Sequence, residues 1–193
     1  FLVFEAMVGE VMITCEKIRY TCKYGESYLS PDYRKVPLML GFKSASVQYY
    51  PLGVIGCIVP WVRLLTSTKK GGGDEARGLN LSVFVELSFP QLHLAVISSI
   101  FAGNATIVKF SEFASWSRSY YQELVQSVLI ARGHDPNLVQ FLPGYGDTGA
   151  ALVQAKGTSK ILFIGSPGVG RKVMETAAKN LIPVILELGG KDP

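Results

Sequence analysis

The strongest constraint on the fold is an alternation of short apolar runs with helical patterns, which begins near Gly53. The runs are rich in Val, Ile and Leu, which is typical of strands buried on both faces of a sheet. They cover residues 54–59, 105–109, 138–142, 160–164 and 183–188. Strands and helices that alternate at this short spacing form βαβ units. The sequence therefore predicts an α/β fold with a doubly wound, Rossmann-like parallel sheet.

Segments with an apolar residue at every third or fourth position lie between these runs and predict amphipathic helices. Pro90 can begin the first helix and Gly103 can end it, whereas Ser115 or Ser117 can cap the second. A further helix is expected after residue 165. The residues expected to face the core in these helices are Leu92, Val96, Ile100, Tyr121, Leu124, Val128, Leu129, Val169, Val173, Met174 and Ala177.

Residues 1–50 follow a different pattern, which predicts an N-terminal region made of a helix and a hairpin. Apolar residues recur at every third or fourth position from Met7 to Ile18, as on a helix with one buried face. Cys15 and Cys22 fall on one face of this helix, where a free cysteine most often serves as a small hydrophobic residue. The segment 41–50 contains β-forming residues and predicts one strand of the hairpin.

The second predicted region, residues 51–193, contains the sheet and one segment that breaks its rhythm. Residues 62–88 are polar and glycine-rich, and they have no periodicity. A structureless segment of this length inside a compact domain is unusual. We interpret 62–88 as an atypical insertion, either an excursion of the chain or sequence, such as a retained intron, that does not belong to the mature protein.

Composition narrows the possible classes of protein. Hydrophobic residues make up 48% of the chain and charged residues 18%, as in globular domains with a buried core. The net charge of +4 is mild, and no basic run with interleaved aromatics points to nucleic acid. No apolar run is long enough to span a bilayer. The 3 cysteines and 2 histidines have no metal-ligand spacing, so we expect no metal, no disulfide framework and a reducing intracellular compartment.

The most distinctive phrases of the sequence follow the predicted strands, and ligands of open α/β sheets bind at the carboxyl ends of strands. These phrases are PLGVIGCIVPW from Pro51, VKFSE from Val108, GYGDTG from Gly144, FIGSPGVGR from Phe163 and PVILELGGKDP from Pro183. Together they resemble the aldehyde dehydrogenase superfamily, over nearly the whole chain except 62–88. The wording around 15–18 and 114–117 is most similar to a plant-type branch with membrane-anchored members.

The resemblance implies a nicotinamide dinucleotide cofactor, NAD in preference to NADP. Lys109 and Glu112 match the pair that binds the adenosine ribose hydroxyls, where a carboxylate repels a 2′-phosphate. Ser166 matches the pyrophosphate site at a helix N-terminus. Residues 58–61 match the wall beside the nicotinamide, and 144–149 match the loop over the adenine side. Besides Lys109, Glu112 and Ser166, the cofactor-binding positions that the resemblance implies are Ile58, Val59, Pro60, Trp61, Gly144, Gly146, Gly149, Gly165, Val169, Leu188 and Gly189.

The resemblance also implies a reaction, the oxidation of an aldehyde to a carboxylic acid through a thiohemiacetal on a cysteine. Glu187 matches the family's general base, which activates water to hydrolyse the thioester left after hydride transfer. The family's nucleophilic cysteine lies well beyond the ELGGK phrase, and Cys57, inside an apolar strand, is no substitute. We therefore interpret the sequence as a fragment cut at both ends, without the catalytic domain beyond 193 and inactive by itself.

A second difference from the family lies beside Trp61. The family has an Asn directly after this tryptophan, and the side-chain amide of that Asn donates to the oxyanion of the thiohemiacetal. Here Val62 follows, and the Asn position aligns with Ser88, after the insertion. Loss of one oxyanion donor typically lowers turnover by ~10²–10³.

Two other hypotheses remain open. The chain could be a non-catalytic relative that binds a dinucleotide or associates with a full-length subunit. The turn from Gly165 to Gly170 also approaches a P-loop, but Arg171 and Lys172 stand where Lys and Ser or Thr are required. The partners expected from the leading hypothesis are a small-molecule aldehyde and further copies of the same subunit in a homo-oligomer.

Overall fold

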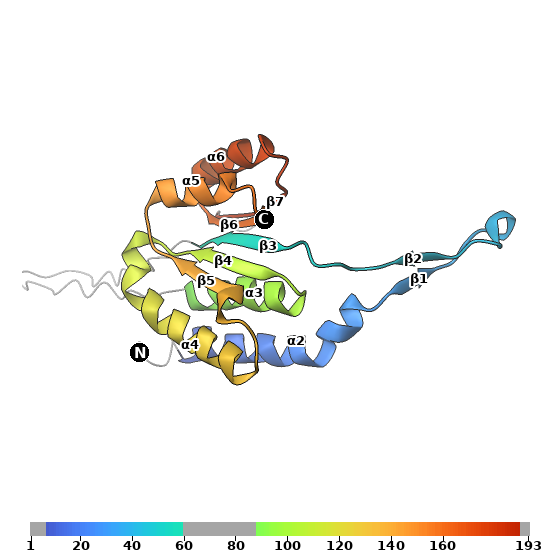
Figure 1. The fold of residues 1–193 in the computed structure, drawn as a ribbon, viewed down its shortest axis with the longest axis horizontal. Helices are drawn as coiled ribbons and strands as arrows, with labels where there is room; N and C mark the ends of the chain where they lie inside the picture. Colours follow the sequence, from blue (N-terminus) through green and yellow to red (C-terminus); the bar gives the residue numbers. More distant parts are fainter. Residues whose placement is uncertain (1–6, 60–87, 190–193) are drawn as a thin grey trace, which may run out of the picture.

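The computed structural model describes residues 7–59 and 88–189. In this part of the chain, five parallel strands form one sheet in the order β5-β4-β3-β6-β7 (Figure 1). The strands are β3 (Val54–Ile58), β4 (Ala105–Lys109), β5 (Val139–Leu142), β6 (Thr158–Gly165) and β7 (Val184–Leu188). Each strand overlaps one of the five predicted apolar runs, so the predicted parallel sheet is confirmed.

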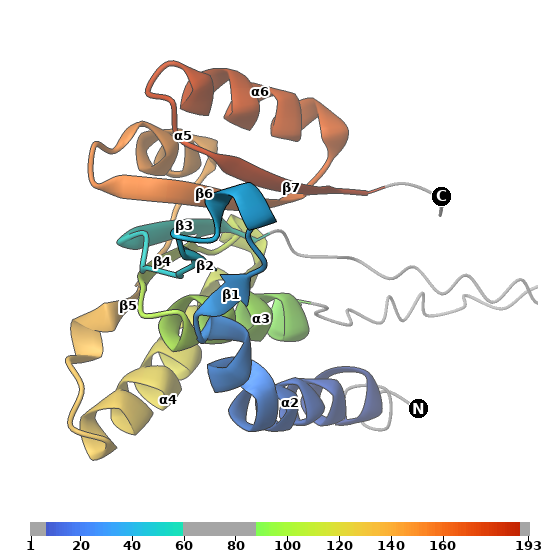
Figure 2. The same ribbon diagram turned by 90° about the vertical axis from the view of Figure 1, so that its right-hand side faces the viewer.

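The chain winds outward from β3 in two directions. Helices α3 (Ser88–Phe101) and α4 (Arg118–Ala131) connect β3 to β4 and β4 to β5. The chain then returns to the other side of β3, where α5 (Gly146–Gln154) precedes β6 and α6 (Pro167–Ala178) precedes β7. Figure 2 shows α3 and α4 on one face of the sheet and α5 and α6 on the other. The strand order reverses between β3 and β6, which is the topological switch point of a doubly wound sheet.

Each face of the sheet has its own hydrophobic core. One core joins Ile55, Cys57 and Val108 of the sheet to Val96 of α3 and Leu129 of α4. The other core, under α5 and α6, contains Leu152, Val153, Ile161, Phe163, Val173 and Ala177. Burial of both faces explains why β3 and β4 are continuous apolar runs, whereas the outer strands β5 and β7 each have exposed residues.

Gly56 shows how closely α5 approaches the central strand. A Cβ at this position would lie 2.6 Å from Cδ1 of Ile161 and 3.2 Å from Cγ of Leu152. Only glycine therefore fits between β6 and α5 at the middle of β3.

The predicted helix faces are partly wrong. Val96, Leu129, Val173 and Ala177 are buried as expected, but several other predicted core residues are exposed: Leu124, Val128, Val169 and Met174. In α4 the predicted stripe is wider than the surface that the sheet can cover. Ser117 occupies the N-cap of α4, yet its hydroxyl donates to the carbonyl of Ala114 rather than capping the helix.

The predicted N-terminal helix exists, but most of its apolar face is uncovered. A π-helical segment, η1 (Met7–Met12), leads into α2 (Ile13–Leu29), in which Thr14 is buried. Helix α2 packs against α3 rather than against the sheet, as Figure 2 shows. Cys15 and Cys22 are both exposed, so the prediction that they face an apolar environment is wrong. The reason is that α2 has α3 as a neighbour along only part of its length.

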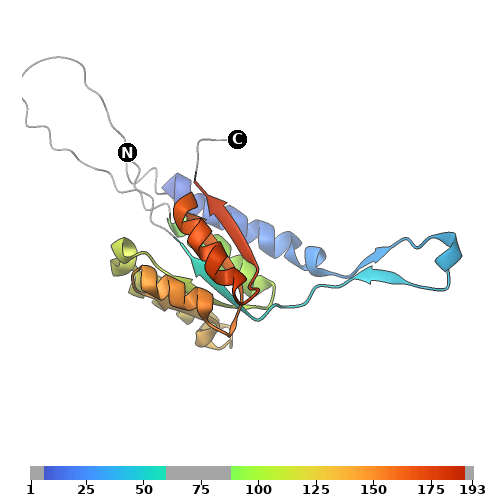
Figure 3. The ribbon, with the colours of Figure 1, turned by 90° about the horizontal axis from the view of Figure 1, so that it is seen from above.

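The predicted hairpin is confirmed and projects away from the sheet (Figures 1 and 3). Strand β1 (Asp32–Arg34) pairs antiparallel with β2 (Ala45–Val47), and every residue of both strands is exposed. A 3₁₀ turn, η2 (Leu38–Leu40), forms the end of the hairpin. The division into regions 1–50 and 51–193 stays a prediction. Of the predicted insertion, 62–87 lies outside the described residues, and Ser88 begins α3.

In the described ranges, 7–59 and 88–189, no helix is both long and apolar enough to cross a bilayer.

Candidate cofactor site at the switch point

The parallel register aligns the carboxyl ends of neighbouring strands. Ile58 lies beside Lys109 on one side and Phe163 on the other, and Gly165 lies beside Leu188. Because β3 and β6 are also the strands of the switch point, their ends flank the crevice in which such folds bind ligands. The sheet thus brings to one edge most of the residues that the sequence singled out.

An ion pair lies at the carboxyl end of β4. Nζ of Lys109 lies 3.5 Å from Oε2 of Glu112, which begins a 3₁₀ turn, η3 (Glu112–Ser117). The Lys109 side chain is 8% exposed and that of Glu112 is 33% exposed. The lysine is therefore fixed against the sheet, while the carboxylate remains accessible to hydroxyl groups of a ligand.

Helix α6 begins directly at the crevice. Ser166 is its N-cap residue in an extended conformation, is exposed and makes no side-chain capping hydrogen bond. Pro167 has no N–H group, and the first intrahelical bond runs from the N–H of Gly170 to the carbonyl of Ser166, at 2.9 Å. The N–H groups of Gly168 and Val169 in the first turn therefore have no intrahelical acceptor. Together with the helix dipole, they form a site suited to an anion.

At three glycines near this edge, an added Cβ would meet a neighbouring side chain at short distance. A Cβ on Gly165 would lie 2.6 Å from Cζ of Phe163, and one on Gly170 would lie 2.5 Å from Cδ2 of Leu188. Gly144 has φ +148° and would contact the Thr148 side chain. Their presence is explained without any ligand.

Three other glycines at this edge have no such neighbours. A Cβ on Gly146, Gly168 or Gly189 would meet no described atom within 4 Å. Packing does not explain these residues, and the space beside their backbone is available to a ligand that approaches closely. This open space is the structural observation that fits a dinucleotide best.

The GYGDTG phrase does not form a single loop. Gly146 is the first residue of α5, and Gly149 is buried within that helix. A Cβ on Gly149 would make an ordinary contact, 3.8 Å, with Cδ1 of Ile58. The predicted loop is therefore largely a helix start, and Gly149 lies against the side chain predicted to form the nicotinamide wall.

Strand β7 directs its last residues to different sides. The Leu188 side chain packs against Gly170 of α6, and the N–H of Gly189 donates to the carbonyl of Gly165 at 3.1 Å. Glu187 pairs with Ile164 in the register and is exposed. Leu186 packs into the core under α5 and α6, so the alternation of the strand directs Glu187 to the opposite face of the sheet. The role of Glu187 stays a prediction.

The predicted wall beside the nicotinamide is described as far as Val59. Val59 is buried at the end of β3, and its N–H donates to the carbonyl of Lys109 at 3.3 Å. Pro60 and Trp61 lie outside the described residues, as does Val62, so the predicted loss of the oxyanion donor stays a prediction.

Arg118 is a residue at this edge that the sequence did not indicate. Its Nη1 donates to the carbonyl of Phe141, at 3.3 Å, and to Oε1 of Gln122, at 3.0 Å. It therefore ties the start of α4 to the end of β5, next to the strand that carries Lys109. An arginine at a helix start resembles an ordinary surface charge, so only the tertiary structure reveals this role.

The cysteines do not supply a nucleophile at this edge. Cys57 is fully buried inside β3, and burial raises the pKa of its thiol from 9.0 to about 12. A thiol that resists ionisation at neutral pH is a poor nucleophile. Cys15 and Cys22 lie on α2, which packs on α3. The described residues contain no group of three or more His, Cys, Asp and Glu that could hold a metal ion.

Known proteins share both sequence and fold with this chain. Residues 88–193 match the sequence profile of the aldehyde dehydrogenase family. An aldehyde dehydrogenase-like protein of Schizosaccharomyces pombe is 38% identical over 192 residues, which cover 98% of this chain and 32% of that protein. The substrate-bound structure of AldH from Staphylococcus aureus is 26% identical with a TM-score of 0.74, and the match covers 98% of this chain and 35% of that one.

Two further similar structures are complexes with a dinucleotide cofactor. PnpE in complex with nicotinamide adenine dinucleotide is 27% identical with a TM-score of 0.70, and the match covers 93% of this chain and 30% of that one. Succinic semialdehyde dehydrogenase from Streptococcus pyogenes, in complex with NADP⁺, is 20% identical with a TM-score of 0.72. That match covers 95% of this chain and 33% of that one, and it supports the fold alone.

The fold and the switch-point site define a chain of the doubly wound, Rossmann-like α/β class. The family match then makes the assignment specific: the chain belongs to the aldehyde dehydrogenase family. It spans about a third of the length of the curated relatives it matches. The resemblance drawn from the strand-end phrases is thereby confirmed, and the plant-type branch stays a prediction.

Proposed function

We propose that this chain is the dinucleotide-binding part of an aldehyde dehydrogenase that oxidises an aldehyde to a carboxylic acid with NAD, and with NADP less well. The open space beside Gly146, Gly168 and Gly189, next to the uncapped start of α6, carries this proposal. The names of the related proteins support the reaction. They do not favour the alternative of a non-catalytic relative.

The described residues fit the parts of a dinucleotide. Lys109 and Glu112 would hold the adenosine ribose, because the accessible carboxylate can accept two hydroxyl hydrogen bonds. Ser166 and the first turn of α6 would hold the pyrophosphate through N–H groups and the helix dipole. Ile58 and Leu188 would lie beside the nicotinamide. When bound, the dinucleotide supplies the hydride acceptor.

The preference for NAD follows from charge. A carboxylate at residue 112 attracts ribose hydroxyl groups and repels the 2′-phosphate of NADP. The Lys109 ammonium offsets this repulsion only in part, because it is already paired with Glu112 at 3.5 Å.

Glu187 is proposed as the group that accepts a proton from water. Its exposed position at the end of β7 leaves the carboxylate free to move toward a substrate beside the crevice. None of the three cysteines of these 193 residues is placed to act as the nucleophile. We therefore expect this chain by itself to bind the dinucleotide without oxidising an aldehyde.

Calorimetric titration of the 193-residue chain with NAD and NADP tests the proposal. The chain should bind NAD saturably, and more tightly than NADP. Glu112→Gln should weaken NAD binding by about fivefold, the loss of roughly 1 kcal/mol from a charge-assisted hydrogen bond, and should tighten NADP binding. Glu123→Gln, which removes the same charge from exposed α4, is the matched control and should change neither affinity.

Two outcomes would contradict the proposal. Absence of saturable binding of either dinucleotide by a chain with a folded circular dichroism spectrum would rule out a cofactor domain. Binding of ATP with Mg²⁺, but of neither dinucleotide, would instead favour the P-loop hypothesis.

We further propose that the protein assembles as a homo-oligomer. The end of the β1–β2 hairpin carries apolar side chains with almost no cover: Leu38, Met39 and Phe42. Apolar groups gathered on a projecting element are typical of a surface that another subunit covers.

A further inference from the structure

An apolar cavity lies among the helices on one face of the sheet, away from the switch point. It is open to solvent on one side and is lined by α2, α3, α4 and the segment between α4 and β5, and its volume is about 770 Å³. Gly103 and Asn104, which precede β4, and Leu138, which precedes β5, belong to its wall. The cavity therefore opens at the amino ends of these strands, at the opposite edge of the sheet from the candidate cofactor site. We call it the α3–α4 cavity.

The wall of the α3–α4 cavity is mostly apolar, with Phe101 as its one aromatic hydrocarbon side chain. Its apolar side chains include Ile18, Ile97, Ile100, Leu124, Val128 and Leu138. Leu124 and Val128 are 40% and 56% exposed, and they are two of the residues that the sequence predicted to be buried. Figure 2 shows α2, α3 and α4 together on this face of the sheet. The volume lies within the range of small-molecule sites, which is roughly 300–1,000 Å³.

The ionisable side chains of the wall are all basic. Its ionisable residues are Arg132 and His134, and the residues that line it include no Asp or Glu. Arg132 forms no ion pair with another described residue. At the C-terminal end of α4, the carbonyl of Leu129 already accepts the N–H groups of Arg132 and His134. This carbonyl is therefore not left without a hydrogen-bond donor beside the cavity.

Few polar groups of the wall are free to bind a polar ligand. Oδ1 of Asn104 already accepts the N–H groups of Leu52, at 2.6 Å, and Gly53, at 3.0 Å. A peptide would bring amide groups into a wall with almost no partners for them, which is costly. An aliphatic chain has no such groups and pairs better with this wall.

We propose that the α3–α4 cavity binds a single-chain aliphatic carboxylate, with its tail between α3 and α4 and its carboxylate at Arg132. The guanidinium supplies the charge-assisted hydrogen bonds that an anionic head group needs. The aliphatic wall supplies an affinity that increases with the length of the tail. This inference does not depend on the proposed dinucleotide function, because the two sites lie at opposite edges of the sheet.

Titration of the 193-residue chain with octanoate, decanoate and dodecanoate, all below their micelle concentrations, tests the proposal. Each additional methylene group should tighten binding about three- to fourfold, and the stoichiometry should be one. Dodecanol should bind about tenfold more weakly than dodecanoate because it lacks the charge. Dodecyltrimethylammonium, with the same tail and the opposite charge, should bind more weakly still.

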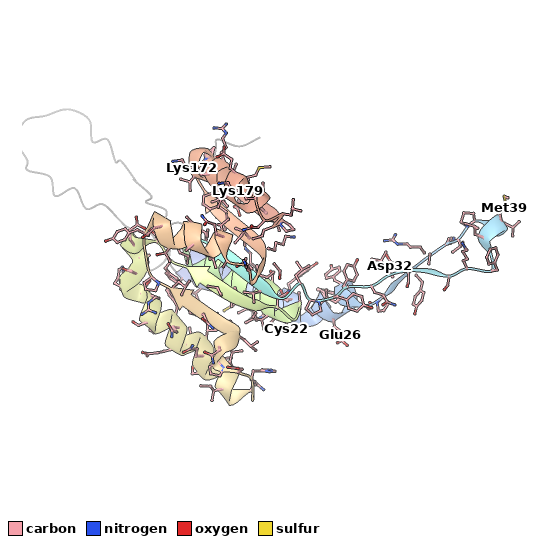
Figure 4. All side chains as sticks on the ribbon, turned by 45° about the horizontal axis from the view of Figure 1, so that its top comes forward. Cys22, Glu26, Asp32, Met39, Lys172 and Lys179 are labelled. Atoms are coloured by element: carbon pink, nitrogen blue, oxygen red, sulfur yellow. The ribbon has the colours of Figure 1, made fainter. Side chains whose placement is uncertain are left out.

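Paired variants locate the site. Val128→Trp should fill the cavity and weaken dodecanoate binding at least tenfold, whereas Ile130→Trp, on the same helix but outside the wall, should not. Arg132→Gln should weaken dodecanoate about tenfold and leave dodecanol unchanged. Lys179→Gln, the same loss of charge at the end of α6 (Figure 4), should change neither affinity. Circular dichroism confirms that each variant is folded.

Three results would overturn the proposal. Dodecanoate that does not bind below its micelle concentration would show that the cavity takes no such ligand. Equal effects of Val128→Trp and Ile130→Trp would place any binding elsewhere. The third result is self-association of the chain. If Val128→Trp abolished it and Ile130→Trp did not, the cavity would be a contact between two polypeptide chains instead.

Discussion

The three cysteines of this chain differ in reactivity because the fold buries only one of them. Cys57 lies inside β3, and its side chain has no exposed area, whereas Cys15 and Cys22 are exposed on α2. The native state therefore resists formation of the Cys57 thiolate, and the pKa of this thiol rises to about 12. Two thiols should react with a disulfide reagent at once, and the third only after unfolding.

The same burial predicts a pH dependence of stability. The native pKa of Cys57 is raised above its ordinary value of 9.0, so the unfolded chain loses this proton first as the pH rises. The stabilising contribution is complete below about pH 9 and falls by roughly 1.4 kcal/mol per pH unit from pH 9 toward 12. Urea denaturation of the native chain and of Cys57→Ala at several pH values measures it. Equal slopes in the two proteins above pH 9 would contradict the prediction.

At the candidate cofactor site, the contact between Lys109 and Glu112 is local in the sequence. Lys109 ends β4 and Glu112 begins η3 three positions later, so this short connection brings them together without help from distant elements. Arg118 was missed because its acceptor, the carbonyl of Phe141, is 23 residues away. The sequence also does not distinguish Gly165, which packing requires, from Gly168, which it does not.

At the scale of elements, one side chain joins the starts of two strands. Asn104 is buried just before β4, and its Oδ1 accepts the N–H groups of Leu52 and Gly53 just before β3. The carbonyl of Gly53 in turn accepts the N–H of Ala105 at 3.0 Å. This clamp fixes the point at which the two strands begin to pair.

Removal of the clamp has a predictable cost. Asn104→Ala leaves two backbone donors without their acceptor and should lower the free energy of unfolding by about 1–3 kcal/mol. Asn104→Asp keeps an acceptor oxygen in place and should lose less. Urea denaturation compares the three proteins, and an equal loss in both variants would show that the side-chain oxygen is not the stabilising group.

The outward faces of the helices were the least predictable feature of the elements. The periodicity of α4 correctly indicates a helix, but Leu124 and Val128 line the α3–α4 cavity instead of the core of the sheet. The periodicity of α2 likewise gives the helix but not its cover. A sequence period fixes which residues share a face, whereas the neighbouring element decides whether that face is buried.

The whole molecule combines a layered body with a projecting hairpin. The body buries two cores around one sheet, whereas β1 and β2 pair only with each other among the described strands. We expect a second subunit to cover the apolar end of the hairpin, because Leu38 is 96% exposed there.

Sedimentation velocity tests association through this hairpin. The chain should self-associate as its concentration rises, and Leu38→Asp should shift it toward the monomer. Leu181→Asp, at a residue that is 89% exposed on the body after α6, is the matched control and should leave association unchanged. A chain that stays monomeric at all concentrations would contradict assembly through the hairpin.

The sequence by itself determined how many parallel strands there are and how they follow one another along the chain. It also determined the helices between them and the family of the chain. These follow from local patterns, because side-chain period and turn residues act over a few positions. Only the tertiary structure decided that β6 returns beside β3, that Gly146, Gly168 and Gly189 border open space, and that Arg132 lies in the wall of an apolar cavity. Those features depend on contacts between segments far apart in the chain, which no local pattern encodes.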